Sequence, residues 1–290
     1  MPFVGLFISL LTPLPFLYYA TKLGLYKGMK LAAFALFTIG LIAKLIGQPH
    51  IILLGIELGL LGFVLSELFK RKLGVGQTIF LATLFMLLLG LVCLFFIGLW
   101  RNMGPLEVVL NYLEGHLEAT LKAYEELGIP QENAIGLRTD HKAILNTMAA
   151  IYASLVAVGT GFTVWLNVIL AKPLFRFGNL RYPAFILMSR WQAPDILVWG
   201  VIASGFALFF FEGGIKWMAI NALIVMLVIY LFHGLSIVLF FLSKYNVPSW
   251  MRVGVYFFII IQQPLMVILA LAGLFDQWVD FRKIYKRAQD

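Results

Sequence analysis

Residues Thr78 to Leu99 read TIFLATLFMLLLGLVCLFFIGL, a continuous apolar run that contains no charged side chain. A run of about 20 apolar residues is long enough to cross the hydrocarbon core of a bilayer as an α-helix. The run is rich in leucine and lacks the two-residue alternation of a transmembrane β-strand. It therefore predicts a membrane-spanning helix, with Trp100 and Arg101 at its exit.

The whole chain shares this apolar character. It is 62% hydrophobic and 12% charged, with a mean hydropathy of +0.94. Soluble domains carry about 25% charged residues. We therefore predict an all-α fold, a polytopic transmembrane helix bundle that has the lipid bilayer as its surroundings.

The net charge of +8 comes from basic residues that are scattered through short loops. Such residues usually orient a membrane protein and contact lipid headgroups. They form no basic stripe of the kind that binds nucleic acid, so no nucleic-acid partner is expected. The single cysteine, Cys93, lies inside the apolar run, so we expect neither an internal disulfide nor a thiolate metal cluster.

Further apolar segments on both sides of this run bring the expected total to about eight spans. They cover Phe3–Ala20, Lys30–Ile46, Ile51–Phe69, Ala143–Ala171, Ile196–Phe211, Trp217–Leu242 and Val253–Phe275. Pro13 and Pro15 should kink or break the first segment, since proline frees backbone carbonyls. We expect four parts: an N-terminal bundle (1–103), a polar insert (104–142), a C-terminal bundle (143–275) and a basic interfacial tail (276–290).

The insert is the one water-compatible stretch of the chain, and Pro105 to Leu127 predicts a single amphipathic helix. Its apolar residues share one narrow face at a spacing of three or four: Leu106, Leu110, Leu113, Leu117, Leu121 and Tyr124. A second stripe is acidic and contains Glu107, Glu114, Glu118 and Glu125. Two interpretations stay open. The leucines cover the bundle while the glutamates are solvated, or Glu114, Glu118 and Glu125 dock a protein partner.

The orientation in the membrane stays open because the basic residues divide nearly evenly between alternate loops. The cluster Lys70–Lys72 favours a cytoplasmic position for its own loop, which places the insert outside. The basic tail favours the reverse. This conflict indicates that the span count is off by one or that one segment is re-entrant.

Glu57 is the sharpest candidate for a ligand-binding residue because it lies in the middle of an apolar segment. An ionisable group there is costly and normally faces a bundle interior or a wet cavity. It lies within the sequence Gly55-Ile56-Glu57-Leu58-Gly59, a G-x-x-x-G spacing that lets another helix approach closely. It binds a ligand or a proton, or else it is a protonated or Lys44-paired structural group.

His233 and the pair Gln262 and Gln263 are the next candidates for ligand binding. Pro264 loosens the helix beside the two glutamines, where their amides can bond freed carbonyls. A binding pocket and simple interhelical hydrogen bonds are both compatible with these residues, and Asn167 and Asn221 allow the same two interpretations. A lone histidine is no metal site, since a metal needs three or four donors, so we expect no metal and no cofactor.

The end of the last segment carries Asp276, Asp280, Arg282 and Lys283. Aspartates four residues apart share a helix face and repel mildly, which the basic residues can offset. These four residues favour an interfacial anchor over a docking site. No phosphate-binding glycine loop, H-E-x-x-H or G-x-S-x-G motif is present, so we expect no enzyme.

Several C-terminal stretches resemble the YybS-like family of predicted bacterial membrane proteins. They are Arg190-Trp191-Gln192-Ala193-Pro194-Asp195 with Val198-Trp199, Tyr230 to Val238, and Gly273 to Lys283; the region Pro2 to Pro15 is similar as well. That family usually has glutamine where this chain has His233, and it tends to carry one more hydrophobic stretch at the front. The resemblance implies a remote similarity to the substrate-binding components of energy-coupling-factor transporters, and therefore a pocket among the helices.

We accordingly expect a non-enzymatic, multi-pass protein of the bacterial inner membrane that binds or transports a small molecule, with Glu57 and His233 in the pocket. The alternative is a scaffold that recruits envelope or division proteins through the acidic helix and the basic tail. An intramembrane enzyme, assembled from single residues on separate helices, is a third possibility.

Overall fold

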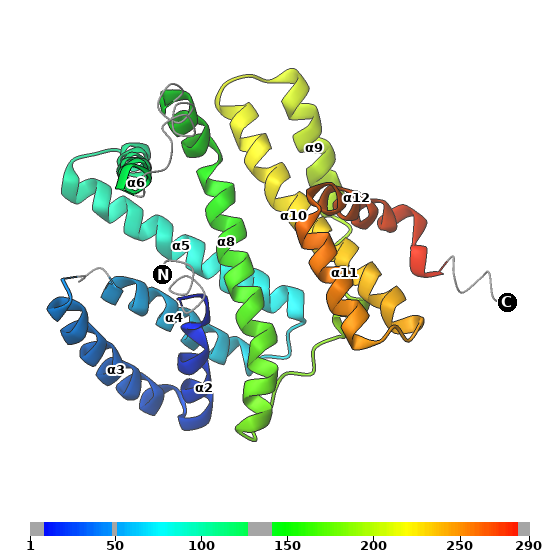
Figure 1. Ribbon diagram of the computed structural model, residues 1–290, viewed down its shortest axis with the longest axis horizontal. Coiled ribbons are helices and arrows are strands. Elements are labelled where there is room, and N and C mark those ends of the chain that lie inside the picture. Colours follow the sequence, from blue (N-terminus) through cyan, green and yellow to red (C-terminus); the bar gives the residue numbers. More distant parts are fainter. Residues whose placement is uncertain (1–8, 48–50, 127–140, 284–290) are drawn as a thin grey trace. The chain divides into compact units, whose positions relative to one another are not determined.

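The computed structural model describes residues 9–47, 51–126 and 141–283, and within these ranges every regular element is a helix (Figure 1). The helices are α2 (Pro13–Leu23), α3 (Leu25–Leu45), α4 (Ile51–Phe69), α5 (Val75–Arg101), α6 (Pro105–Glu126), α8 (His141–Phe177), α9 (Leu197–Phe210), α10 (Gly214–Lys244), α11 (Ser249–Ile261) and α12 (Gln263–Val279), with a short 3₁₀ turn at Met188–Arg190. The all-α prediction is confirmed.

Five of the described helices are long and apolar enough to cross a membrane: α3, α4, α5, α8 and α10. Many of their large apolar side chains point outward, as with Phe34 at 70% and Phe96 at 64% exposure. A soluble fold would bury such side chains, whereas a membrane helix presents them to lipid. The structure is therefore that of a multi-pass membrane protein.

The expected count of eight spans is not reached among the described residues, for local reasons. The first segment breaks before Pro13, which leaves α2 with 11 residues, and residues 3–8 lie outside the described part. Helix α9 has 14 residues and is therefore about 21 Å long, short of the roughly 30 Å of hydrocarbon. The last segment is broken into α11 and α12, which meet at 102° and count as a sixth span or a re-entrant loop.

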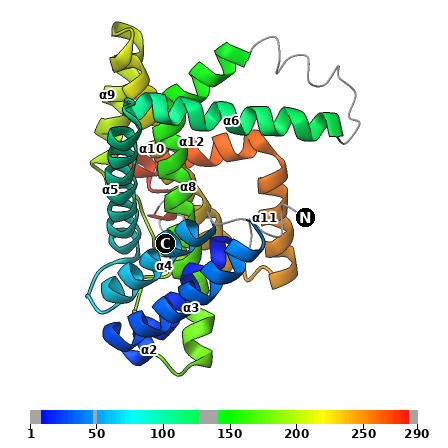
Figure 2. The ribbon, with the colours of Figure 1, turned by 90° about the vertical axis from the view of Figure 1, so that its left-hand side faces the viewer.

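The corner between α11 and α12 lies at Gln262, and Figure 2 shows it in orange. Pro264 sits in the first turn of α12, where its missing N–H is no loss. The sequence predicted a loosened helix at this point, and the structure shows a complete break. The bent pair is either a broken span or a re-entrant loop, and a re-entrant segment is one of the two explanations that the conflicting loop charges allowed.

The described chain forms two compact units that are interleaved in the sequence. Unit 1 contains residues up to Phe95 together with Gly159–Phe185, and unit 2 contains Phe96–Val158 together with Ile186 onward. Each unit has its own apolar core. In unit 1 the core residues include Leu17 of α2, Leu65 of α4 and Phe175 of α8.

Two glycines of α4 determine how α2 packs in unit 1. A Cβ atom on Gly62 would collide with the backbone of Pro13 and Leu17, and one on Gly59 would press on the Phe16 ring. Thr21 and Ser66 then share a hydrogen bond of 2.9 Å further along the same two helices. The close approach therefore involves Gly59 of the predicted Gly55–Gly59 spacing together with Gly62, whereas Gly55 faces the Leu36 side chain of α3.

The predicted amphipathic helix of the insert is α6, and its start follows the capping rule. The backbone N–H of Gly104 donates to the Glu107 carboxylate at 2.9 Å, which satisfies one of the first free donors. Val108 and Val109 are the buried residues of this helix. Leu106, a member of the predicted apolar face, is 62% exposed and is therefore not covered by the protein. Residues 127–140, the expected linker, lie outside the described residues.

In unit 2, α10 is the central helix. Helix α9 packs along one side of it, and Figure 1 shows the two running side by side. Helix α12 packs against α10 more extensively than any other pair of elements in the described chain. The candidate site lies at this second contact.

Candidate functional site

Helices α10 and α12 cross in backbone contact because two glycines face each other. A Cβ atom on Gly234 would collide with the carbonyl of Leu269, and one on Gly273 would collide with the carbonyl of Tyr230. Only glycine allows such an approach, which is typical of tight helix pairs in membranes. The crossing brings the residues next to these glycines into direct contact.

The first consequence is a buried pair of ionisable side chains, His233 of α10 and Asp276 of α12. The Nε2 atom of His233 lies 3.1 Å from Oδ2 of Asp276, and the side chains are 1% and 0% exposed. The two groups are close enough for an ion pair, but the ring N–H is not aligned for a hydrogen bond with that oxygen. Within the described chain, Nδ1 of His233 has no hydrogen-bond partner.

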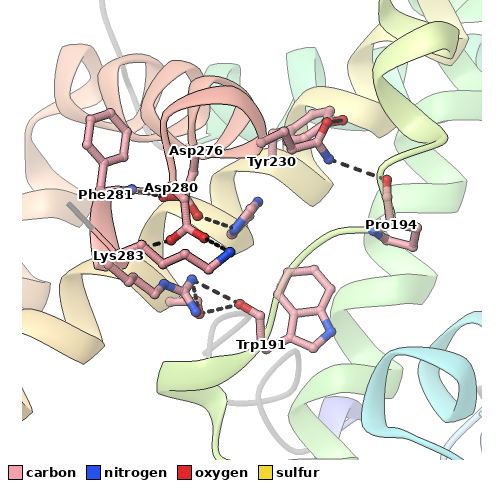
Figure 3. A network of polar contacts seen from close by, with 11 residues as sticks. Trp191, Pro194, Tyr230, Asp276, Asp280, Phe281 and Lys283 are labelled. Atoms are coloured by element: carbon pink, nitrogen blue, oxygen red, sulfur yellow. Dashed lines mark hydrogen bonds and ion pairs between the residues drawn. The ribbon is translucent and has the colours of Figure 1, made fainter. Parts of the chain in front are cut away.

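Asp276 also organises the chain that follows α12. Its Oδ1 atom accepts a hydrogen bond of 2.9 Å from the backbone N–H of Phe281. Asp280 ends the helix in a left-handed conformation with φ of 43°, and its carboxylate lies 2.8 Å from Nζ of Lys283. Figure 3 shows both carboxylates facing this turn. The turn brings Arg282 back toward the helix crossing.

Arg282 is 9% exposed and bonds to the other elements of unit 2. One of its terminal nitrogens donates to the Trp191 carbonyl and to the Ser236 hydroxyl, both at 3.1 Å. Ser236 in turn donates to the same carbonyl at 2.7 Å. Burial lowers the pKa of the Arg282 guanidinium below its usual value, and the charges of Asp276 and Asp280 oppose this change.

The loop before α9 closes the site. The Trp191 ring meets the His233 ring edge to face, with centroids 6.2 Å apart. On the other side of the crossing, the Tyr230 hydroxyl donates to Gln277 Oε1 at 3.2 Å, and the Gln277 amide reaches the Pro194 carbonyl at 3.4 Å (Figure 3). The network therefore joins α10, α12, the turn after α12 and the loop before α9.

This arrangement can hold or release a proton, and it can bind a ligand that replaces one of its ionic contacts. It offers one histidine and one carboxylate in contact, and the described residues contain no group of three or more His, Cys, Asp or Glu side chains that could hold a metal ion. The chemistry that it supports is therefore ionic recognition or proton binding.

The other predicted ligand-binding residues are not part of this network. Gln262 and Gln263 are exposed at the corner, and Gln263 lies about 20 Å from Asp276 along α12 at about 1.5 Å per residue. Glu57 belongs to unit 1 and is exposed, with no hydrogen bond or ion pair to another described residue, Lys44 included. At about 100° per residue, it points roughly opposite to Gly55 and Gly59.

Asn167, which is buried, and Asn221, which is half-buried, make the interhelical hydrogen bonds that the sequence allowed. Asn167 donates to the Leu10 and Thr163 carbonyls, both at 2.8 Å. Asn221 of α10 accepts from the Ser154 backbone N–H at 2.8 Å and donates to the Ala150 carbonyl at 2.6 Å. In an undisturbed helix these last two groups would bond to each other, so the Asn221 amide bridges a step in the α8 ladder.

An open cavity of about 370 Å³ lies beside Asn221 in unit 2. Its lining is formed by Ala153, Ser154, Asn221, Ala222, Val225 and Met226. Its wall is mainly apolar, with Ser154 and Asn221 as the polar residues, and it is open to the surroundings over much of its extent. His233 lies on the same helix, about two turns beyond Met226.

Sequence reasoning found His233 but missed its partners. Asp276 and Arg282 were interpreted as parts of an exposed interfacial anchor, and the structure buries both. The Asp280–Lys283 pair of that interpretation is confirmed. A local signal was present, because His233 adjoins Gly234 and Asp276 lies three residues after Gly273. A glycine near an ionisable residue on an apolar segment is compatible with a close helix crossing, but it does not identify the partner segment.

A family match covers nearly the whole chain and includes His233 and Asp276, whereas Asp280 to Lys283 lie beyond it. Residues 1–277 match the family model described as predicted membrane protein DUF2232, and the chain belongs to that family. No curated protein and no solved structure matches the sequence. The family description agrees with the membrane helices and leaves the activity to be argued from the site.

Proposed function

We propose that this DUF2232 protein is a non-enzymatic, multi-pass protein of the bacterial inner membrane that binds a small molecule within its helix bundle and serves in its transport. The observation that supports this most strongly is the His233–Asp276 pair, buried at 1% and 0% exposure between two membrane helices.

A purely structural role does not account well for this pair. Burying charges carries a large desolvation cost, and apolar residues of similar volume often stabilise a fold as well or better. Gly234 and Gly273 already provide the close helix contact without any charge. Ionisable residues inside membrane segments normally mark substrate, ion or proton pathways. The incomplete hydrogen bonding of His233 leaves a group free for such a task.

The cavity beside Asn221 is the proposed place for the body of the ligand. It lies on α10, as His233 does, so a ligand that moves α10 acts on both. The resemblance to the YybS-like family, and through it to the substrate-binding components of energy-coupling-factor transporters, points the same way. Glu57, Gln262 and Gln263 remain further proposed ligand-binding residues, to be tested separately.

A thermal-shift screen of the purified full-length protein against vitamins, their precursors and ions tests the proposal. A ligand at 100 times its Kd stabilises by about 2.7 kcal/mol, which raises the Tm by roughly 5–10 °C. His233→Leu and Asp276→Asn should abolish the shift, and Val225→Phe should do so by filling the cavity. Glu67→Gln, which changes an exposed carboxylate in unit 1, is the matched control. The idea fails if no compound shifts the Tm or if every variant keeps the shift.

A scaffold that recruits envelope or division proteins is the second candidate function. Glu114 and Glu118 are exposed on α6, while Leu113 and Leu117 are half-buried, as a docking helix with its back against the protein requires. The Glu125 side chain and tail residues 284–290 lie outside what the structure describes.

Charge reversal separates the two candidates. Replacing Glu114, Glu118 and Glu125 by lysine should release a co-purifying partner from a scaffold and leave a ligand-induced thermal shift intact. Ligand binding without any partner, unaffected by the reversal, would exclude the scaffold.

A further inference from the structure

One end of unit 1 collects basic side chains from helices that are far apart in the sequence. Helices α2 and α4 run parallel, because Gly62 meets Pro13 and Leu17 while Ser66 bonds to Thr21. Their C-termini therefore lie at the same end of the unit.

Helix α8 ends at the same place. The Phe175 ring in its last turn lies 5.8 Å from the Phe69 ring at the end of α4. Gly178, which follows α8, lies directly against the Tyr18 ring of α2. Three helix C-termini thus converge within one unit.

Each of these termini carries exposed basic residues. Lys22 lies in the last turn of α2, Lys70–Lys72 follow α4, and Arg176 and Arg181 lie on either side of the end of α8. We call these residues the basic end. The first two turns of α3, which follows α2 directly, add Lys27 and Lys30.

Glu67 offsets one charge of the basic end, since its carboxylate lies 2.8 Å from Nζ of Lys70. Among the described residues, no ion pair joins the other basic residues of this end to an acid of unit 1. At the other end of α3, by contrast, the basic residue is Lys44. Within the described part of unit 1 the basic charge is therefore strongly one-sided.

Aromatic residues accompany the charges. Lys22 Nζ lies 5.3 Å from the Tyr18 ring centroid, and Lys30 Nζ lies 4.6 Å from that of Tyr26. Tyrosine and tryptophan with basic neighbours are typical of the level of the lipid headgroups.

Helix dipoles explain part of the pattern, since cations are favoured near a helix C-terminus. That effect falls off within the last turn, whereas Arg71, Lys72 and Arg181 lie beyond it. We infer that the basic end of unit 1 lies at the cytoplasmic face of the membrane and binds the headgroups of anionic phospholipids. Counted over the whole chain, the basic residues divide nearly evenly between alternate loops because the count mixes two units. Within unit 1 alone, they gather at one end.

The orientation is tested by accessibility of two cysteines at the two ends of α3, introduced one at a time into a Cys93→Ala background. Lys27→Cys lies at the basic end, and Leu45→Cys lies at the other end, where Leu45 is 87% exposed. In intact bacterial spheroplasts, a membrane-impermeant maleimide should label Leu45→Cys, and should label Lys27→Cys only after permeabilisation. The reverse pattern, or equal labelling of both, would overturn the inference.

The lipid contact is tested by native mass spectrometry of the full-length protein titrated with phosphatidylglycerol or phosphatidylcholine. Each basic residue near an anionic surface contributes about fivefold in affinity, so a triple Lys70→Gln, Arg71→Gln, Lys72→Gln variant should bind phosphatidylglycerol at least tenfold more weakly. Phosphatidylcholine binding should not change.

The matched control removes the same charge elsewhere, through Lys44→Gln, Arg101→Gln and Lys216→Gln, three exposed residues outside the basic end. An equal loss in the control, or no loss in the first variant, would contradict the inference. If the first variant does not fold, salt titration of the unaltered protein decides: high salt must abolish the preference for phosphatidylglycerol.

Discussion

Units 1 and 2 bury polar groups of different kinds. Unit 1 joins its helices with neutral groups, such as the Asn167 amide and the Thr21–Ser66 hydroxyl pair. Unit 2 buries the ionisable groups His233, Asp276 and Arg282. Neutral interhelical hydrogen bonds are modest structural contacts in a membrane, whereas buried charges are costly and are kept where a function needs them. The comparison supports the proposal that the ligand site lies in unit 2.

The largest effect is expected at the glycine crossing on which the unit 2 site depends. Gly273→Ala places a methyl group against the Tyr230 carbonyl, so the helices must separate. We expect a loss of about 4 kcal/mol or failure to fold, measured by thermal unfolding in mild detergent. Gly254→Ala in α11, where a Cβ meets nothing within 4 Å, is the control and should be tolerated. Equal stability of both variants would show that the helices do not cross in backbone contact.

The next effect is expected at the buried charge. Asp276→Ala removes the carboxylate that lies beside His233 and Arg282, and with it the acceptor for the Phe281 N–H. We expect a loss of about 3 kcal/mol in the free energy of unfolding, by denaturant titration. Asp276→Asn keeps the shape and the acceptor and should lose less. A loss below about 1 kcal/mol for the alanine variant would make the charges of unit 2 energetically equivalent to the neutral groups of unit 1.

A smaller effect is expected at the neutral counterpart in unit 1. Asn167→Ala removes the hydrogen bonds to the Leu10 and Thr163 carbonyls, of which the second already bonds within α8. We expect a loss of about 1 kcal/mol in the free energy of unfolding, by the same titration. One interhelical hydrogen bond in a membrane stabilises a protein less than the amount lost when a buried ion pair is broken. A loss larger than that of Asp276→Ala would reverse the comparison of the units.

The smallest effect at neutral pH is expected at Tyr182, in the loop of unit 1 that follows α8. Its hydroxyl donates to the Val168 carbonyl at 2.8 Å, and burial raises its pKa to about 12. In the unfolded chain the phenol ionises near pH 10, so its contribution to stability is complete below pH 10 and is lost as the pH rises to 12. Tyr182→Phe should cost less than about 1 kcal/mol at pH 7 and should make stability less dependent on pH between 10 and 12. An unchanged alkaline dependence would show that this tyrosine is not buried in solution.

The sequence predicted the long helices well because their signals are local. Helix α4 has the predicted bounds Ile51–Phe69, and α6 begins at the predicted Pro105. The angle at Gln262 was beyond such reasoning, because Pro264 signals a weak point and only tertiary contacts decide how far the helix bends. Periodicity likewise does not show which residues of a helix face are covered by a neighbouring helix. Leu106 was therefore predicted to be covered, and it is exposed.

The sequence predicted only one half of the buried pair. A histidine in an apolar segment is a candidate because burying an ionisable group in the membrane costs free energy, and His233 was identified in this way. Its pairing with Asp276 joins two segments that are far apart in the sequence, and no spacing rule connects them. Glu57 had the same local signal as His233, yet it points away from its neighbouring glycines and has no partner among the described residues. The cost of an ionisable residue in an apolar segment identifies candidates, and only the packing of the helices distinguishes between them.

The contact of Gly234 with Gly273 also has a mechanical consequence. The two backbones meet over about one turn, from Tyr230 to Gly234 of α10 and from Leu269 to Gly273 of α12. Because there is no room for a Cβ atom on either glycine, this contact fixes the register of the two helices. The 3.1 Å distance between His233 and Asp276, which lie beside the contact, is fixed with it.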